Sequence, residues 1–354
     1  MAPIKSLQPP EYTEDEQQAL IDFVLAFRKS QIQDFLKRME LPTSGTKSEL
    51  RERLNEALEQ GQLSHEQLVD LLDAVAPWGK QHVFLYQGPR GELQAWKDPN
   101  SVHQKLKRHG LDELFDAKLR LILPNKLTLS SIAHSKGKLR ITAIRRREYS
   151  ERVPNHDDVK QGENGKRITL KAYMDHVSRT LAAFEWDLLA NTAMLQITQL
   201  NKDTLYDELA KEFCGLVAGW LDIGKFDLLD VRPAINRLRE LADREDGKAE
   251  TRSHVIDYRT LQGYSLTAKS PSARHSVSGD EDIKAAMTDI AKKGGVGNLG
   301  NFYWLPGVNG GPVPNPLKAE VHTFIVGGRS RINFPTANTE EVVRYVVHRV
   351  RALS

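Results

Sequence analysis

The chain has little of what marks a secreted or membrane-spanning protein. It contains one cysteine, Cys214, which excludes an intramolecular disulfide and a zinc site built from several cysteines. No apolar run is long enough to cross a bilayer. The first residues, Met1 to Lys5, lack the apolar core of a secretory signal. We therefore expect an intracellular protein without membrane contact, in the nucleus if eukaryotic and in the cytoplasm or nucleoid if prokaryotic.

Motifs that carry catalytic chemistry are also scarce. The 11 histidines are spread along the chain without metal-ligand spacing. Asp222, Asp227 and Asp230 lie close together, but the helix–loop–helix pattern around them indicates helix ends and caps. Gly295–Gly300 has the glycine spacing of a dinucleotide-binding loop, but such a loop must follow a strand, and here a helix is expected before it. We predict a flexible loop there, no catalytic residue, no metal, no cofactor and no enzymatic activity.

Positive charge, in contrast, is concentrated. The net charge is only +3, but between Lys97 and Arg147 there are 13 Lys and Arg against 4 Asp and Glu. Such a block is expected of a face that binds a polyanion. The candidate DNA contacts lie on a short helix and on or beside a hairpin: Lys105, Lys107, Arg108, Lys136, Lys138, Arg140, Arg145, Arg146 and Arg147. The alternative is a solvated sheet edge whose basic residues prevent aggregation.

The N-terminal region predicts short helices with well-marked starts. Glu14–Lys29 carries apolar residues at helical spacing. Ser30 fits a capping box at the start of a second helix, and Pro42 stops that helix. Thr46 and Ser64 each begin a further capping box, so two more helices are expected. We predict a small helical bundle.

The loop before the third helix has the features of a phosphate-binding helix start. Gly45 permits backbone angles that other residues resist and lets the backbone approach a phosphate. The helix that follows offers free amides and the positive end of its dipole. Lys47, Arg51 and Arg53 add full charges in or near the first turn. Contacts of this kind position a protein on a duplex but read little sequence.

The segment Gln31–Glu40 and the run Leu41–Leu54 together resemble the SAP motif, a helix–extended loop–helix module that binds double-stranded DNA. In that family the loop and the helix start face the DNA backbone and groove. Matched residue by residue, the resemblance implies DNA contact at Thr43, Ser44, Gly45, Thr46, Lys47 and Arg51. The family usually has Gly before the Leu-Pro pair, whereas this chain has Glu40, which predicts a longer helix or local repulsion. The alternatives are a small helical bundle whose loop is simply well capped, and a helix–loop–helix module that binds protein.

After Pro77 the pattern changes to alternation. Strands are predicted at His82–Tyr86, Leu93–Trp96, Lys118–Ile122, Lys126–Ser130 and Lys138–Tyr149. Asn100 is expected to cap a short basic helix. The order of a helical unit, a strand and a hairpin around Leu139–Ile144 resembles the centromere protein N family of the kinetochore. That resemblance implies recognition of nucleosomal DNA partly through basic residues.

Residues 151–166 are polar and rich in Asp, Asn and Gly, which is typical of a linker. Helices are predicted beyond it at Tyr173–Leu189, Thr204–Trp220, Val231–Ala242, Asp280–Lys293 and Thr339–Leu353. Hairpins are predicted at His254–Lys269 and Glu320–Phe334, and a loop rich in Gly, Pro and Asn at Gly294–Pro316. In the last helix the valines are expected inside, with Arg344, His348, Arg349 and Arg351 outside.

The sequence as a whole predicts an α+β protein in successive parts. These are a disordered leader (1–12), a helical SAP-like DNA-binding unit (13–76), a basic α/β unit with antiparallel hairpins (77–150), a linker (151–167) and a larger C-terminal α+β unit (168–354). The last is expected to bind a protein partner or a second copy. We predict a non-enzymatic protein that binds double-stranded DNA with low sequence specificity in a chromatin or nucleoid assembly. The alternatives are a metal-dependent nuclease with a dispersed site and a protein-interaction adaptor.

Overall fold

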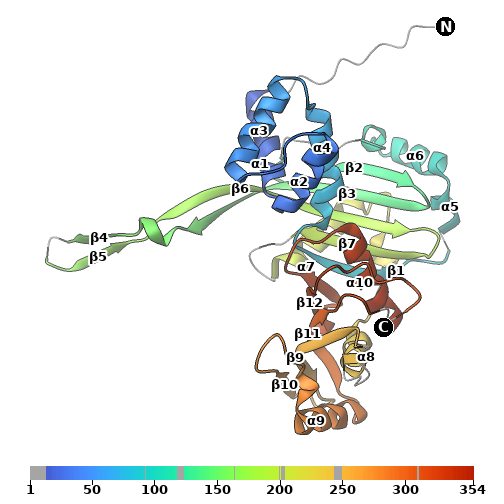
Figure 1. The fold of residues 1–354 in the computed structure, drawn as a ribbon. Coiled ribbons are helices and arrows are strands. Elements are labelled where there is room, and N and C mark those ends of the chain that lie inside the picture. Colours follow the sequence, from blue (N-terminus) through green and yellow to red (C-terminus); the bar gives the residue numbers. More distant parts are fainter. Residues whose placement is uncertain are drawn as a thin grey trace. The chain divides into compact units, whose positions relative to one another are not determined.

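The computed structural model describes residues 13–91, 93–117, 123–162, 164–198, 200, 204–242, 249–308 and 311–354 (Figure 1). N-terminal helices and a large antiparallel sheet with further helices confirm the α+β class. The predicted leader 1–12 and the predicted strand Lys118–Ile122 lie outside the described residues.

Contacts divide the chain into two compact units, each assembled from separate segments. Unit 1 is made of Met1–Leu72, Lys118–Thr128 and Ile144–Thr180, and unit 2 of Asp73–Ala117, Leu129–Ala143 and Leu181–Ser354, as far as their residues are described. The sequence predicted parts that follow one another along the chain. The chain instead returns to unit 1 twice, and the second return, at 144–180, occurs because two long strands run through both units.

Unit 1 contains the predicted N-terminal helices: α1 (Glu14–Leu25), α2 (Lys29–Arg38), α3 (Lys47–Glu59) and the first part of α4 (His65–Val75). The capping boxes at Thr46 and Ser64 are confirmed, since each side chain accepts a hydrogen bond from the amide three residues on. The box predicted at Ser30 is wrong. Helix α2 starts two residues earlier, with Arg28 as its N-cap, and the Arg28 amide donates to Gln31 Oε1 at 3.1 Å.

Helices α2 and α3 end in the same way. At the end of α2 the Leu41 amide donates to the Leu36 carbonyl at 2.9 Å, and Glu40 has a φ of +59°. At the end of α3 the left-handed position is held by Gly61, with a φ of +68°. Both are Schellman motifs, which favour glycine at this position. The prediction that Glu40 lengthens the helix is therefore wrong, because α2 stops at Arg38 and Glu40 takes the place of the glycine.

Apart from residues 123–128, the remaining described part of unit 1 is a β-ribbon. It consists of the distal parts of β3 (Lys138–Arg152) and β6 (Tyr173–Asp187), with the hairpin β4 (Asp158–Gln161) and β5 (Arg167–Leu170) between them. The segment predicted as a linker thus contains strand structure. The helix predicted at Tyr173–Leu189 is also wrong. Residues 181–186 are all buried, and a short continuous buried run does not distinguish helix from strand.

Unit 2 is built on the large sheet, whose strand order is β10-β9-β11-β12-β13-β1-β7-β6-β3-β2, with β8 paired to β1. Its strands are β1 (Gln81–Gln87), β2 (Thr128–Ser135), β7 (Thr192–Thr198), β8 (Asp227–Leu228), β9 (Thr251–Arg259), β10 (Ser265–Lys269), β11 (Val296–Trp304), β12 (Val321–Val326) and β13 (Arg331–Phe334). Its helices include α5 (Leu93–Lys97), α6 (Pro99–Arg108), α7 (Thr204–Val217), α8 (Arg232–Ala242), α9 (Glu281–Lys292) and α10 (Glu340–Leu353).

Three local predictions in unit 2 are corrected. The strand predicted at Leu93–Trp96 is the helix α5, and Asp98 rather than Asn100 caps α6. The loop predicted around Gly295–Gly300 is mostly strand β11. Its glycines serve packing: a Cβ at Gly297 would lie 2.5 Å from the Ile235 side chain of α8. The glycine spacing therefore reflects the close approach of β11 to α8.

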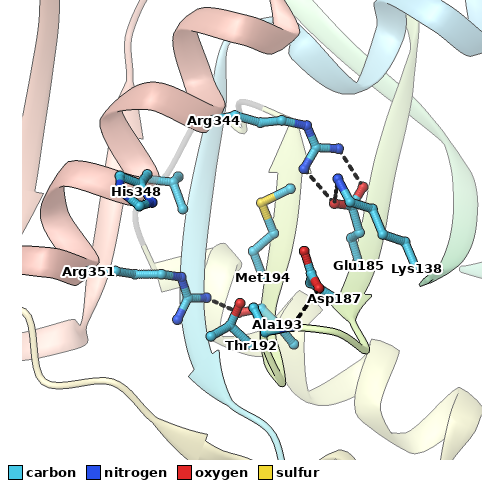
Figure 2. A pocket seen from close by; sticks show the side chains of 11 residues that line it. Lys138, Glu185, Asp187, Thr192, Ala193, Met194, Arg344, His348 and Arg351 are labelled. Carbon is cyan, nitrogen blue, oxygen red and sulfur yellow. Dashed lines mark hydrogen bonds and ion pairs between the residues drawn. The ribbon is translucent and has the colours of Figure 1, made fainter. Parts of the chain in front are cut away.

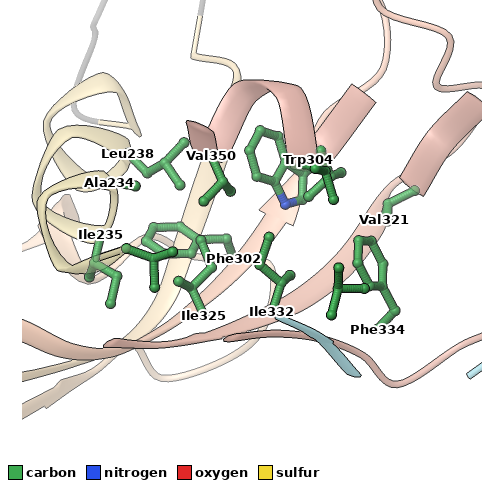
Figure 3. Packing of buried hydrophobic residues seen from close by; sticks show 14 of the residues in the cluster. Ala234, Ile235, Leu238, Phe302, Trp304, Val321, Ile325, Ile332, Phe334 and Val350 are labelled. Carbon is green, nitrogen blue, oxygen red and sulfur yellow. The ribbon is translucent and has the colours of Figure 1, made fainter. Parts of the chain in front are cut away.

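Helix α10 has one face toward β6 and β7 (Figure 2) and its valines in the core. That core also contains side chains of α8, β11, β12 and β13 (Figure 3). Arg349, predicted to lie outside, is buried. Its Nε and Nη2 donate to Glu250 at 2.5 and 2.7 Å, and Glu250 is itself buried. The sequence pattern of α10 did not reveal this partner, which is 99 residues away.

Candidate nucleic-acid interface

The first candidate surface is the loop before α3 together with the start of that helix, all within unit 1. Gly45 has a φ of +118°, and a Cβ there would lie 2.7 Å from Glu49 Oε2. The Glu49 carboxylate accepts from the Thr46 amide, and its own amide donates to Thr46 Oγ1 at 3.3 Å. The bonds from Thr46, with smaller effects from Arg53 and Lys29, hold the pKa of Glu49 below its ordinary value. The turn thus depends on glycine and on an ionised Glu49.

Three successive carbonyl groups of this loop are bound by side chains of the same unit. Arg53 Nη1 donates to the carbonyls of Pro42 at 2.9 Å and Ser44 at 2.6 Å. Gln33 Nε2 donates to the Thr43 carbonyl at 2.8 Å. Ser44 and Thr46 themselves are exposed, and Thr43 is half-buried. The acceptor groups of the loop are therefore occupied, while its hydroxyls and the free amides of the helix start suit an anion.

Lys47 and Arg51 have structural partners that the sequence did not predict. Lys47 is exposed, but its Nζ donates to the carbonyls of Leu25 at 2.6 Å and Phe27 at 3.0 Å, at the end of α1. Arg51 forms an ion pair with Asp22 of α1, in which 37% and 51% of the side chains are exposed. Both residues join α1 to α3. Exposed ion pairs contribute little to stability, so a phosphate can compete with Asp22 for Arg51.

Sequence reasoning missed three exposed cations in the same helices. Lys29 contributes to the lowered pKa of Glu49, which places its charge near the start of α3. Lys37 and Arg38 form the last turn of α2, just before the loop. The sequence signal for Lys37 and Arg38 was a basic last turn of the helix that leads directly into the loop of the SAP motif.

The second candidate surface is the ribbon of unit 1. Arg145, Arg146 and Arg147 lie on β3, where side chains alternate between the two faces. Arg146 is exposed and forms an ion pair with Glu148 at 2.8 Å. Arg147 lies on the opposite face and stacks on the Tyr149 ring, 4.9 Å from its centroid. The triplet is thus in one unit with the SAP-like helices, but its charges are divided between two faces.

The ribbon also touches those helices directly. The guanidinium of Arg179, on β6, lies over the Phe23 ring of α1, with 4.8 Å from its carbon to the ring centroid. This contact joins the two candidate surfaces inside unit 1.

Other sequence-predicted contacts belong to unit 2. Lys105 lies 4.0 Å over the Trp96 ring. Lys107 and Arg108 are exposed in the last turn of α6, where their charges also complement the helix dipole. Lys136 is exposed in the turn between β2 and β3, with a φ of +50°. The predicted basic hairpin is thus shared between the two units, and a DNA-binding role for these residues stays a prediction.

Lys138 and Arg140 surround a buried carboxylate. Glu185 accepts from both terminal nitrogens of Arg344, at 2.6 and 2.9 Å, and from Arg140 at 3.3 Å. Lys138 Nζ is 3.6 Å from Glu185, and only 6% of the Glu185 side chain is exposed. Burial alone would raise the pKa of Glu185, but the hydrogen bonds and charge of Arg344, with the other two cations, bring it below its ordinary value. Arg140 and Arg344 both stack on Trp78.

Two other kinds of feature are absent from the part of the chain that the structure describes. Among the described residues, no group of three His, Cys, Asp or Glu side chains is placed to hold a metal. In the same part of the chain, no helix has the length and apolarity that a membrane span requires.

Comparison with known protein families gives a match in the region of the first candidate surface. Residues 25–59 match the family model of the SAP domain, and this match contains α2, the loop and α3. A comparison with the curated proteins gave no match. The resemblance to the centromere protein N family stays a prediction. The predicted SAP resemblance is therefore confirmed for residues 25–59, and a match to the SAP domain indicates nucleic-acid binding in general.

Proposed function

We propose that the protein binds double-stranded DNA, mainly through unit 1, with low sequence specificity and without enzymatic activity. The observation that carries this proposal is the start of α3 within the SAP domain. A glycine-dependent turn there leads into free helix amides, the nearby loop carbonyls are occupied, and Lys29 and Lys47 stand beside it. This combination favours the phosphate backbone.

The ribbon supplies a second contact in this proposal. Arg145, Arg146 and Arg147 extend the basic surface of unit 1 along β3, and the stack of Arg179 on Phe23 links the ribbon to α1. Two modest sites joined in one unit bind a duplex more tightly than either alone when both reach it. Phosphate contacts dominate, so affinity falls steeply with salt. Specificity is weak or directed at DNA shape.

Assembly with a protein partner or with a second copy is the remaining part of the proposal. Support comes from exposed apolar side chains on β4, β5 and β6, namely Val159, Ile168, Leu170, Tyr173, Met174 and Val177. Exposed apolar groups gathered on one ribbon favour an interaction site. The compartment proposed is the nucleus or the nucleoid, where DNA is available.

The test is a titration of the full chain against a duplex, the corresponding single strand and an RNA duplex at several salt concentrations. We expect the DNA duplex to bind best, with a logarithmic salt slope of several units, about −0.9 for each phosphate neutralised. Lys29→Gln combined with Lys47→Gln weakens duplex binding about tenfold or more and makes the slope shallower. The matched control, Lys292→Gln with Lys318→Gln, removes the same charge from exposed positions of unit 2 and leaves binding unchanged.

Equal affinity of the test and control variants would contradict the proposal and favour a protein-interaction adaptor. Degradation of plasmid that depends on added Mg²⁺ would favour a nuclease instead. A preference for the single strand or for RNA would retain nucleic-acid binding but remove the duplex as the target.

A further inference from the structure

A pocket of about 250 Å³ in unit 2 is not used by the proposed DNA contacts (Figure 2). One wall is α10, which supplies Arg344, Val347, His348 and Arg351 at helical spacing. The facing wall comes from β3, β6, β7 and the turn between the last two. It consists of Lys138, Glu185, Asp187, Ala190, Thr192, Ala193 and Met194. The walls are thus basic on one side and mixed on the other, around the apolar side chain of Met194.

The carboxylates of the lining are largely committed to other groups. Both Glu185 oxygens accept from Arg344. Asp187 Oδ1 accepts from the amides of Leu189 at 3.0 Å and Ala190 at 2.9 Å, which fixes the turn after β6. The second oxygen of Asp187 is therefore the main acceptor that remains for a ligand.

Donors, in contrast, remain in excess. Arg351 donates to the carbonyls of Tyr86 at 3.1 Å and of Ala193, so its guanidinium is held in place with further N–H groups to offer. Burial lowers the pKa of Arg351 to about 10, and Asp187 opposes this, so the side chain is charged at neutral pH. Lys138 Nζ is beyond hydrogen-bond distance of Glu185, and His348 is exposed at the rim.

We propose that this pocket binds a small phosphate ester that also carries a hydroxyl group. Lys138, His348 and Arg351 bind the phosphate oxygens, and the hydroxyl donates to Asp187. Three nitrogen-bearing side chains around one cavity match the several acceptor oxygens of a phosphate. The volume equals that of roughly eight water molecules, which suits a phosphorylated sugar but not a nucleic-acid chain.

Two sources offer this chemistry: a free phosphorylated metabolite, and the terminal phosphate and sugar of a nucleic acid. The free ester enters the pocket whole, whereas a nucleic acid inserts only its end. The test below separates them.

Isothermal titration of the full chain with ribose 5-phosphate, inorganic phosphate and ribose tests the proposal. We expect ribose 5-phosphate to bind best, inorganic phosphate more weakly, and ribose not measurably. Lys138→Met and His348→Gln each weaken ribose 5-phosphate binding about tenfold, as expected for a hydrogen bond to a charged group. Both residues are partly or fully exposed, so these variants should fold, and Lys318→Met on the exposed surface is the control without effect.

Asp187→Asn separates the two parts of the site. It removes a negative charge but keeps an oxygen that can accept from the turn amides. Inorganic phosphate should therefore bind more tightly, and the difference in affinity between ribose 5-phosphate and inorganic phosphate should become smaller. A 5′-phosphorylated oligonucleotide that displaces ribose 5-phosphate, when the 5′-hydroxyl form does not, would identify the nucleic-acid end as the source. Displacement by neither form would identify the free ester.

No saturable binding of either phosphate compound up to about 10 mM would overturn the proposal, since weaker affinity has no biological use here. Equal affinity of Lys138→Met, His348→Gln and Lys318→Met would overturn it as well. The proposed DNA binding is tested independently with closed circular DNA, which has no terminal phosphate.

Discussion

The start of α3 in unit 1 and the Glu185 cluster in unit 2 use cations in different ways. At the start of α3, Lys47 and Arg53 bind main-chain carbonyls at the surface and Arg51 pairs with a half-exposed carboxylate. In the cluster, three cations gather around one carboxylate that is almost fully buried.

The two regions differ in how deeply their charged groups are buried. A surface cation exchanges its partner at small cost, because water and salt already weaken the pair. A buried carboxylate depends on its cations, since its charge has no water to replace them. Positive charge in the sequence therefore has two roles here. At the start of α3 the charge is available to a ligand, whereas in the cluster it neutralises an internal carboxylate. Of the three cations in the cluster, only Lys138, at 3.6 Å from Glu185, is also proposed to bind the ligand of the pocket.

The largest expected effect is on the stability of unit 2. Glu185→Gln leaves Arg344, Arg140 and Lys138 without their common counter-ion and should lower the free energy of unfolding by about 3–5 kcal/mol. Asp22→Asn, which breaks the exposed pair with Arg51, should cost about 1 kcal/mol or less. Urea denaturation measures both, by fluorescence for unit 2, which contains all 5 tryptophans, and by circular dichroism for the helices of unit 1. Similar costs for the two variants would remove the distinction between the regions.

The stability of unit 2 should also depend on pH through Glu185. The pKa of Glu185 is below its ordinary value, so its contribution to stability is complete above the unfolded pKa of about 4.3 and is lost as pH falls through the folded value. The free energy of unfolding, measured by tryptophan fluorescence, should therefore fall in the natural chain as the pH is lowered below about 5. The fall should be smaller in Glu185→Gln. An identical pH dependence in the two proteins would mean that Glu185 is not ionised in the folded state.

A smaller effect is expected from Arg53→Met, which removes the donor to the Pro42 and Ser44 carbonyls. Since Arg53 positions the loop rather than the DNA, duplex affinity should fall several-fold, on the order of 1 kcal/mol, while the salt slope stays the same. Hydrogen exchange of the amides around Thr46 should become faster. A shallower salt slope would show instead that Arg53 itself neutralises a phosphate.

The smallest effect should come from the two helix ends. Glu40→Gly places the favoured residue in the left-handed position at the end of α2 and should stabilise unit 1 by about 0.5–1 kcal/mol. Gly61→Ala makes the opposite change at the end of α3 and should destabilise it by a similar amount. Thermal unfolding followed by circular dichroism compares the two variants. If Glu40→Gly does not stabilise unit 1, contacts of the Glu40 side chain outweigh the cost of its backbone angle.

Local signals in the sequence predicted local structure well. The capping boxes at Thr46 and Ser64 and the turn at Gly45 were correct, because each is decided within a few residues. Strand β6 was mistaken for a helix, because burial on both faces hides the alternation. The partners of Arg140 and Lys47 were not predictable, because they lie 45 and 22 residues away and only the fold brings them together.

In the proposed function, the start of α3 and the β3 ribbon bind one duplex. A double-mutant cycle of duplex affinity at several salt concentrations tests whether both do so. It combines Lys29→Gln and Lys47→Gln with replacement of Arg145, Arg146 and Arg147 by Gln. We predict that each set weakens binding alone, and that the combined variant has the weakest binding and the shallowest salt slope. If the arginine replacements change neither affinity nor slope, the ribbon does not touch the DNA and this part of the proposed function is wrong.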